Sequence, residues 1–196
     1  GARYSLLIGI LAAAIDFTIG ILYGGIAGVS SRRVDSIMMR IAEVIYSIPY
    51  LLVVILMSVV FSSQGSGTSL FVIILAMTIT DWVPMAILVR GQVLQLKEAE
   101  YSLASESLGA DQGWILRKHI IPNTLGPILV NVTLTIPRAI FAEATLGFLG
   151  LGLQAPKSSL GTLANDGLAG MAVGLTYQII FPALLISLIM FSFNVL

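Results

Sequence analysis

The sequence predicts an all-α fold: a polytopic membrane helix bundle with five transmembrane helices and one large polar cytoplasmic loop. Hydrophobic residues make up 57% of the 196 residues, charged residues only 10%, and the mean hydropathy is +0.99. Soluble domains carry about 25% charged residues, so a chain this apolar cannot cover itself in water. The apolar runs are too long for barrel strands and lack their alternation, whereas helices satisfy their backbone hydrogen bonds internally within lipid.

Five apolar runs are each long enough to cross the hydrocarbon core, which takes about 20 helical residues. The predicted spans are residues 4–29, 37–61, 69–94, 124–149 and 173–196. Glycines at positions 20, 24 and 28 form a ladder typical of close helix packing, within this subunit or against a twin. Prolines interrupt four spans and predict packing bends, or hinges, at Pro49, Pro84, Pro137 and Pro182.

The connections between the spans predict the orientation of the chain. Arg32 and Arg33 lie in one short loop, and residues 90–123 hold four more basic residues. By the positive-inside rule both segments are expected in the cytoplasm. Residues 62–68 and the glycine-rich residues 150–172 are then expected outside. Both chain ends read as internal, so we expect a larger or trimmed protein whose N-terminal helix is missing.

Composition also excludes several classes of protein. The formal net charge is zero, which argues against a nucleic-acid partner. There is no cysteine and only one histidine, so thiol chemistry, a disulfide framework and a His-cluster metal site are not expected. Neither an H-E-x-x-H nor a G-x-S-x-G pattern occurs, and no catalytic constellation is found. The chain is therefore not expected to be an enzyme.

The polar segment of residues 90–123 contrasts most sharply with the rest of the chain. Its first helix is predicted at residues 98–108, which lack proline and β-branched residues, and Gly109 is expected to end it. Leu103, Ala104 and Leu108 fall near one stripe of that helix. We expect this stripe to form a small apolar contact surface that the surrounding charges keep in water.

A second short helix is predicted at residues 112–119. Asp111 is placed to cap its first turn. We expect Pro122 to end this helix and Asn123 to cap the fourth span. The segment thus predicts a helix, a glycine break, a second helix and a return to the membrane.

These residues carry a resemblance to a known family. The segment resembles the EAA loop of ABC-importer permeases, in which Glu-Ala-Ala is followed at fixed spacing by Gly and by Ile-x-Leu-Pro. In the register Leu103-Ala104-Ser105, Gly109, His119 and Ile121-Pro122, the residues Ala104, Gly109 and Pro122 match that pattern. Four positions depart from it: Leu103, Ser105, His119 and Ile121. The departures resemble the branch that serves dipeptides, oligopeptides and nickel, as do Glu100-Tyr101, Val89-Arg90-Gly91 and the run from Glu143 to Gly152.

This resemblance implies a function and a set of partners. It implies a single permease domain over residues 1–196 in a bacterial inner membrane, with a coupling loop at residues 97–122. The implied partners are two cytoplasmic ATPase subunits that carry ATP and Mg, a second related permease, and an extracytoplasmic binding protein that delivers peptides or nickel-type solutes. The chain itself is expected to bind no cofactor. The coupling residues would be Glu100, Tyr101, Leu103, Ala104, Ser105, Leu108, Gly109 and Pro122.

Charged residues within the spans are the other candidate functional groups. Each costs about 2.5–3.5 kcal/mol at the centre of a span if it is unpaired. Asp81, Arg138 and Glu143 are candidates for the translocation path, although span ends and subunit contacts are equally open explanations. Asp16 or Asp81 would instead serve an ion-coupled secondary transporter, the alternative function. We expect Glu43 to lie near the cytoplasmic end of its span.

The glycine-rich segment of residues 148–171 is expected on the outer side of the membrane. Its length and glycine content are typical of a gate or of a docking surface for a binding protein. An ordinary exposed connector is an equally open interpretation.

Overall fold

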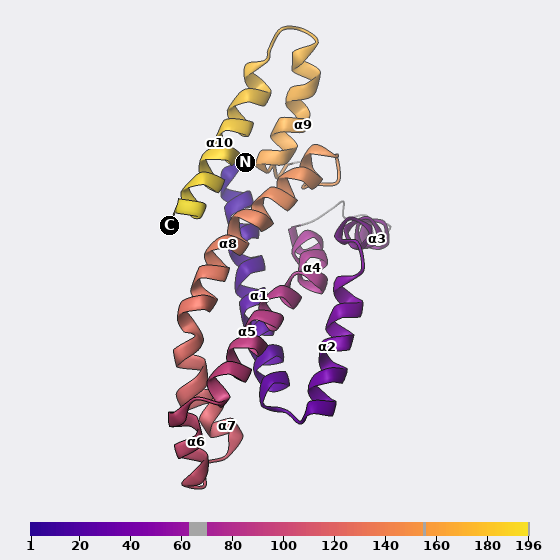
Figure 1. Cartoon of the computed structure of the whole chain (residues 1–196). Coiled ribbons are helices and arrows are strands. Elements are labelled where there is room, and N and C mark those ends of the chain that lie inside the picture. Colours follow the sequence, from indigo (N-terminus) through magenta and orange to yellow (C-terminus); the bar gives the residue numbers. More distant parts are fainter. Residues whose placement is uncertain (63–69, 155, 196) are drawn as a thin grey trace. The chain divides into compact units, whose positions relative to one another are not determined.

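The computed structural model describes residues 1–62, 70–154 and 156–195, and every element within those ranges is a helix (Figure 1). The all-α fold class is therefore confirmed. Most of the predicted connection at residues 62–68 lies outside the described residues. The elements in chain order are α1 (Ala2–Val29), α2 (Arg32–Tyr46), α3 (Tyr50–Ser62), α4 (Leu70–Thr80), α5 (Trp82–Lys97), α6 (Glu100–Ser107), α7 (Gln112–Ile115), the π-helical η1 (Leu116–Ile120), α8 (Ile121–Phe148), α9 (Leu160–Met171) and α10 (Tyr177–Val195).

Within the described residues, four helical stretches are long and apolar enough to cross a membrane: Ala2–Val29, Leu70–Lys97, Gln112–Phe148 and Tyr177–Val195. They correspond to the first, third, fourth and fifth predicted spans. Helices α2 and α3 supply a fifth only if they are counted together as one broken span. The span predicted over residues 37–61 thus consists of two helices with a break at Pro49, one of the positions where a bend is expected.

Proline chemistry explains the break between α2 and α3. The N–H groups of Ser47 and Ile48 still donate to the carbonyls of Glu43 (2.9 Å) and Ile45 (3.2 Å), which closes the last turn of α2. A residue that precedes proline is disfavoured in helical geometry, and proline has no N–H to continue the ladder. The chain restarts as α3, where the carbonyl of Pro49 accepts from the N–H of Leu52 at 2.9 Å.

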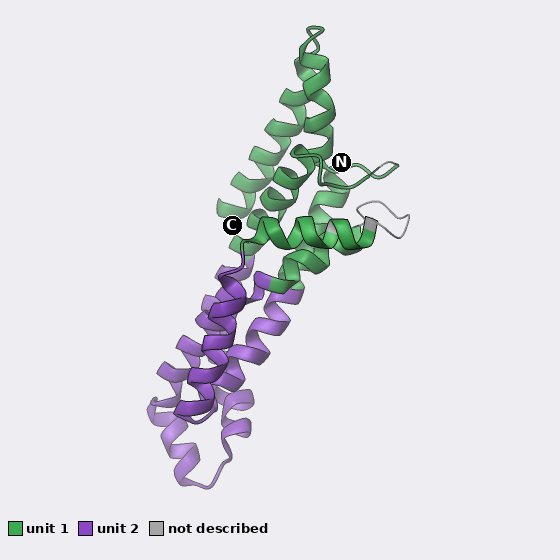
Figure 2. Cartoon of the chain, turned by 90° about the vertical axis from the view of Figure 1, so that its right-hand side faces the viewer, with its two compact units in different colours: residues 1–14, 49–79, 133–196 green, residues 15–48, 80–132 purple. Residues whose placement is uncertain are grey.

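The chain folds into two compact units (Figure 2). Unit 1 contains residues 1–14, 49–79 and 133–196, and unit 2 contains residues 15–48 and 80–132. Helices α1 and α8 each contribute residues to both units. The single permease domain over residues 1–196 stays a prediction.

In unit 2 the glycine ladder of α1 packs against α5. A Cβ atom at Gly28 would lie 2.5 Å from Cγ1 of Val93, and one at Gly24 would meet the backbone carbonyl of Ala86. A Cβ at Gly20 would likewise meet a side chain of α5. The ladder therefore packs helices within this subunit, as small-residue stripes do when backbones approach closely.

Buried apolar side chains fill the rest of unit 2 in two clusters. One joins α1, α2 and α5, and the other joins α5 to the continuous helix of α7, η1 and α8. The first consists of Ala27, Met39, Ala42, Trp82, Val83 and Ala86. The second consists of Met85, Val89, Val93, Ile115, Ile120 and Ile128.

Asp81 occupies the single position between α4 and α5. The cause is Pro84, which has no N–H to donate to the carbonyl of Thr80 and whose ring crowds that carbonyl. The hydroxyl of Thr80 donates to Asp81 Oδ1 at 3.0 Å. The helix is therefore interrupted at Asp81, near the position where a kink is expected, and the interruption carries a carboxylate.

The second helix of the polar loop does not stop at Pro122, which corrects two predictions. Helix α7 passes through η1 directly into α8, and Pro122 and Asn123 lie in the first turn of α8. The π-helical turn comes just before Pro122, where the regular ladder would need the N–H that proline lacks. The side chain of Asn123 donates to the carbonyl of His119 at 2.6 Å and so caps no new helix.

In unit 1 the glycine-rich segment expected as a gate or connector contains a helix. Ser159 and Thr162 form a capping box at the start of α9. Helix α9 then packs against α10, and the two lie side by side in Figure 1. A Cβ at Gly161 would strike the backbone of Ala144, and one at Gly167 would lie 2.8 Å from the backbone of Gln178. These glycines therefore lie where α9 packs closely against α8 and α10, and not in the loop expected from the sequence.

Candidate functional site

Helix α6 presents the contact surface predicted for the polar loop. Leu103 is 49% exposed and Leu108 is 90% exposed, although both are large apolar residues. Ala104 and Glu100 are also exposed on this helix, as is Tyr101 at 39%. Helical spacing places these side chains on the side opposite the buried Ser102. We call this surface, formed by Glu100, Tyr101, Leu103, Ala104 and Leu108, the α6 face.

A hydrogen bond holds α6 against the end of α5. The hydroxyl of Ser102, which is 2% exposed, donates to the carbonyl of Leu96 at 2.8 Å. That carbonyl belongs to the last turn of α5, where the intrahelical ladder leaves acceptors without a partner. Ser105 is half-buried, and its hydroxyl donates to the carbonyl of Tyr101 within α6 at 2.8 Å. Sequence reading missed the role of Ser102, because a serine in a polar loop carries no signal of burial.

Gly109 ends α6 as predicted. Its φ is +88°, a left-handed conformation that glycine adopts without steric cost. The next helix also begins as predicted, since Asp111 Oδ1 accepts from the N–H of Trp114 at 2.8 Å. Gln112 of α7 donates to Glu106 Oε1 of α6 at 2.8 Å. The loop is thus a defined pair of short helices joined by a tight turn.

Aromatic rings cover the junction of the two helices. The rings of Trp114 and His119 meet edge to face with centroids 5.1 Å apart, and Tyr101 lies 6.1 Å from His119. Offset and edge-on pairs of this kind contribute about 0.5–1.5 kcal/mol each. They tie the α6 face to η1 and therefore to the start of α8.

The three residues predicted for a translocation path do not come together in one unit. Asp81 belongs to unit 2, whereas Arg138 and Glu143 belong to unit 1. Arg138 is exposed and Asp81 is half-buried. Glu143 is fully buried, and one of its oxygens accepts from the hydroxyl of Ser5 at 2.8 Å.

Glu143 takes part in the packing of unit 1. The same Ser5 hydroxyl accepts from the N–H of Leu160, the first residue of α9, at 3.1 Å. Glu143 and Ser5 therefore connect α8, α1 and the N-terminus of α9. The other Glu143 oxygen, Oε1, is buried without a hydrogen-bond partner among the described residues.

Asp16 is the most isolated carboxylate in the part of unit 2 that the structure describes. It is 2% exposed, and neither of its oxygens has a hydrogen-bond partner among the described residues. Burial of an unpaired charged group is expensive in an apolar environment. The alternative function of an ion-coupled carrier would rest on this residue or on Asp81.

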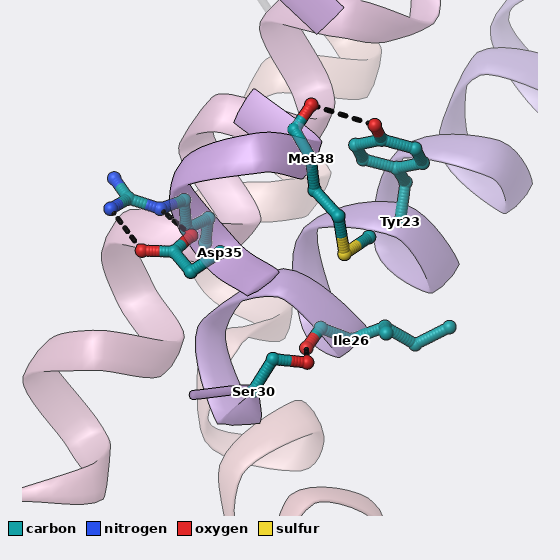
Figure 3. Close-up of polar contacts among 6 residues, drawn as sticks. Tyr23, Ile26, Ser30, Asp35 and Met38 are labelled. Atoms are coloured by element: carbon teal, nitrogen blue, oxygen red, sulfur yellow. Dashed lines mark hydrogen bonds and ion pairs between the residues drawn. The ribbon is translucent and has the colours of Figure 1, made fainter. Parts of the chain in front are cut away.

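Sequence reading missed a bidentate ion pair between α2 and α5. Arg90 Nε and a terminal nitrogen of the guanidinium lie 2.5 Å and 2.6 Å from the two oxygens of Asp35 (Figure 3). The hydroxyl of Tyr23 donates to the carbonyl of Met38 at 2.7 Å, which adds a second polar tie between α1 and α2. The one sequence signal for this pair was that Asp35 and Arg90 carry opposite charges near the ends of neighbouring apolar runs.

A groove lies beside this ion pair on the surface of unit 2. Its volume is about 410 Å³. Helix α2 lines it with Arg32, Ser36, Arg40 and Glu43, and α5 lines it with Ile87 and Arg90. Arg40 and Glu43 are joined by one contact of 3.4 Å, and their side chains are 80% and 59% exposed. Glu43, expected near the cytoplasmic end of its span, lies three residues before the end of α2 that is farther from Arg32 and Arg33.

The apolar helices, the polar helical loop and the intramembrane charges define a multi-span membrane protein of the transport class. The chain belongs to the family described as the binding-protein-dependent transport system inner membrane component, which matches residues 20–196. It is thus an inner-membrane protein with several membrane-spanning helices, and this membership favours an importer over an ion-coupled carrier.

Named relatives support the same family. The chain is 57% identical over 196 residues to the dipeptide transport system permease protein DppC of Bacillus subtilis. The alignment covers 100% of this chain and 60% of that protein. It is 52% identical over 195 residues to the oligopeptide transport system permease protein OppC of the same organism, across 100% of this chain and 62% of the relative. The chain therefore spans about three fifths of the length of these curated relatives.

Solved structures share the fold. An inward-facing structure of the MetNI methionine ABC transporter contains a chain with a TM-score of 0.75, at 23% identity over 99% of this chain and 91% of that one. A chain in the crystal structure of an amino acid ABC transporter with histidines matches with a TM-score of 0.73, at 19% identity over 99% of this chain and 87% of that one.

Proposed function

We propose that this chain is the membrane-spanning permease subunit of an ATP-driven importer, and that its substrates are peptides delivered by an extracytoplasmic binding protein. The family is one of binding-protein-dependent transport, and the two relatives above are named for dipeptide and oligopeptide transport. Transport would proceed by alternating access between inward-open and outward-open states.

The observation that carries this proposal is the exposed α6 face. A helix that leaves Leu103 and Leu108 in water, while charged residues surround it, has the character of a surface that another protein covers. Ala104 at its centre lets a groove close tightly over an amphipathic helix. The proposed coupling residues are Glu100, Tyr101, Leu103, Ala104, Ser105, Leu108, Gly109 and Pro122.

The energy would come from partner subunits. The chain contains no G-x-x-x-x-G-K-[ST] loop, the pattern that cradles ATP phosphates in P-loop ATPases. We therefore assign ATP and Mg to two cytoplasmic ATPase subunits and no cofactor to this chain. A second related permease subunit would complete the membrane part of the importer.

The structure of the loop supports a mechanical route for coupling. Closure of the ATPases around ATP would move the α6 face. Ser102 joins α6 to α5, and α7 continues through η1 into α8 without a break. The turn at Gly109 is short, and Gln112 of α7 donates to Glu106 of α6 across it. Movement of α6 would therefore be transmitted to α5 and α8 with little loss in flexible loops.

A substitution at Ala104 tests the docking surface. Ala104→Glu would bury a carboxylate without a partner, which costs several kcal/mol, and each 1.4 kcal/mol is a factor of ten in affinity. We expect more than a tenfold loss of transport-coupled ATP hydrolysis in the importer reconstituted with its ATPases and binding protein. Ala104→Ser is the matched control and should retain coupling.

A backbone change tests the same surface independently. Gly109→Pro is expected to abolish coupling, because proline cannot adopt the φ of +88° found at this position. Survival of coupled ATP hydrolysis in both Ala104→Glu and Gly109→Pro would remove the docking assignment. Uptake driven by an ion gradient in the absence of ATP would support the carrier function instead.

A further inference from the structure

Helix α2 has three distinct faces. Asp35, Met39 and Ala42 are buried against the rest of unit 2. The two remaining faces are exposed and differ in chemistry. The apolar ridge consists of Val34, Ile37, Ile41 and Val44. The polar stripe consists of Arg33, Ser36, Arg40, Glu43 and Ser47. With about 3.6 residues per turn, the centres of the ridge and the stripe are about a third of a turn apart.

Lipid is an unfavourable environment for the polar stripe. Helix α2 is the first half of the broken span, and a charged side chain that contacts lipid costs up to about 2.5–3.5 kcal/mol, the value at the centre of a span. Arg40 and Glu43 are 80% and 59% exposed, so the rest of the described chain does not cover them. The apolar ridge can face lipid, but the stripe requires water or a polar ligand.

Within the groove described above, the two ion pairs differ in strength. Asp35 and Arg90 are half-buried or better and hold each other through two short contacts, so they form a fixed wall. Arg40 and Glu43 make one contact of 3.4 Å in an exposed position. An exposed pair of this kind contributes about 0–1 kcal/mol, so its two charges are available to another partner at little cost.

We propose that this groove binds the main-chain charges of a peptide in transit, with the Arg40 guanidinium on the carboxylate and the Glu43 carboxylate on the ammonium group. Guanidinium matches carboxylate through two parallel hydrogen bonds. Residues three apart on a helix have Cβ atoms about 5–6 Å apart, which suits the two ends of a short peptide. Ile87, 45% exposed on the α5 wall, offers an apolar surface to a peptide side chain.

The charges favour a peptide over a phosphate group. Glu43 would repel a phosphate of a lipid or a nucleotide, whereas a zwitterion satisfies Arg40 and Glu43 together. This assignment rests on the proposed function as a peptide permease. It identifies the part of the chain that touches the substrate.

Cysteine accessibility tests whether the stripe faces water and the peptide. The chain has no cysteine, so Arg40→Cys and Ile41→Cys each introduce a single thiol on adjacent faces of α2. The intact importer in proteoliposomes is treated with a membrane-impermeant sulfonated methanethiosulfonate, and labelling of this chain is followed by mass spectrometry. We expect Arg40→Cys to react at least about tenfold faster, since the thiolate forms in water and not against lipid.

A thiol that leaves Arg40 and Glu43 intact distinguishes the peptide from other ligands. Ser36→Cys places it in the same groove. Alanyl-alanine supplied with its binding protein and ATP is expected to slow labelling of Ser36→Cys severalfold, and inorganic phosphate is expected to leave it unchanged. An unreactive Arg40→Cys in every state would show that another subunit covers the stripe, and would overturn the proposal. Fast labelling without protection by the peptide would overturn it as well.

Uptake measurements separate this inference from the proposed function. At saturating binding protein, Arg40→Gln and Glu43→Gln should each lower alanyl-alanine uptake roughly tenfold, because hydrogen bonds to charged groups are lost. Arg40→Lys keeps the charge and should retain most uptake, and Ile41→Ala is the control on the ridge. If the wild-type complex shows no ATP-dependent uptake, the proposed function fails. If the wild type imports and Arg40→Gln matches it, only the groove assignment fails.

Discussion

The Asp35–Arg90 ion pair is expected to be a main determinant of the stability of unit 2. Removal of one partner from a fully buried pair costs about 3–5 kcal/mol, and an exposed pair contributes about 0–1 kcal/mol. The Asp35 and Arg90 side chains are 12% and 31% exposed, and the pair is bidentate at 2.5 and 2.6 Å. We therefore place the cost of Asp35→Asn between these limits, at about 2 kcal/mol.

Thermal unfolding measures this cost. For chains of 150–250 residues, 1 kcal/mol shifts Tm by about 2–4 °C, so Asp35→Asn should lower the Tm of the purified complex by about 4–8 °C. Glu43→Gln is the matched control, since it removes one partner of the exposed α2 pair and should shift Tm by less than about 2 °C.

A double-mutant cycle isolates the pair itself. Arg90→Gln should destabilise the complex about as much as Asp35→Asn, and the double variant should fall well short of the sum of the two effects. Equal Tm shifts in Asp35→Asn and Glu43→Gln would refute the argument from burial. Additive effects of Asp35→Asn and Arg90→Gln would show that the two side chains do not interact.

Three further predictions concern glycine conformation, helix packing and a buried hydrogen bond. Gly109→Ala should weaken docking of the ATPases by roughly tenfold in a pull-down titration, because a left-handed φ costs a side chain about 1–2 kcal/mol although nothing lies near its Cβ. Unchanged docking would contradict this. Gly24→Ala should lower Tm because its Cβ would meet a backbone carbonyl of α5. Gly91→Ala is the control and should leave Tm unchanged, because the space around it is open. Equal Tm values for the two variants would contradict the close packing of the glycine ladder against α5. Ser5→Ala should lower the free energy of unfolding by about 1–3 kcal/mol, since it removes the hydroxyl that donates to Oε2 of the buried Glu143. A Tm within about 1 °C of wild type, on the order of experimental error, would show that this hydrogen bond is unimportant.

Spans and loop boundaries were predictable where a local signal controls them. Hydropathy located the apolar runs, and single residues placed the ends of the loop helices: Gly109 by its freedom at positive φ and Asp111 by its side-chain oxygen. The same kind of reasoning failed at Pro122, because a π-helical turn absorbs the missing N–H and the helix continues. At Pro49, where a bend is expected, the helix breaks into α2 and α3.

Glycine was the residue whose meaning sequence reading resolved least well. The ladder in α1 was assigned to packing, and it does pack against α5. The glycines of α9 are expected in a gate, a docking surface or an ordinary connector, yet Gly161 and Gly167 lie where neighbouring backbones approach closely. The difference is that regular spacing every four residues marks a helical stripe, whereas irregular spacing gives no such periodic signal.

The helical membrane fold class, the polar loop and its stripe around Ala104 were predictable, because hydropathy, caps and helical spacing depend on residues only a few positions apart. Which charges are partners depends instead on how distant segments pack. Arg90 meets Asp35 across 55 positions and Ser5 meets Glu143 across 138, and neither separation leaves a local trace. Tertiary packing also left Arg40 and Glu43 exposed together, since the burial of each face of α2 depends on the neighbouring helices and not on α2 alone.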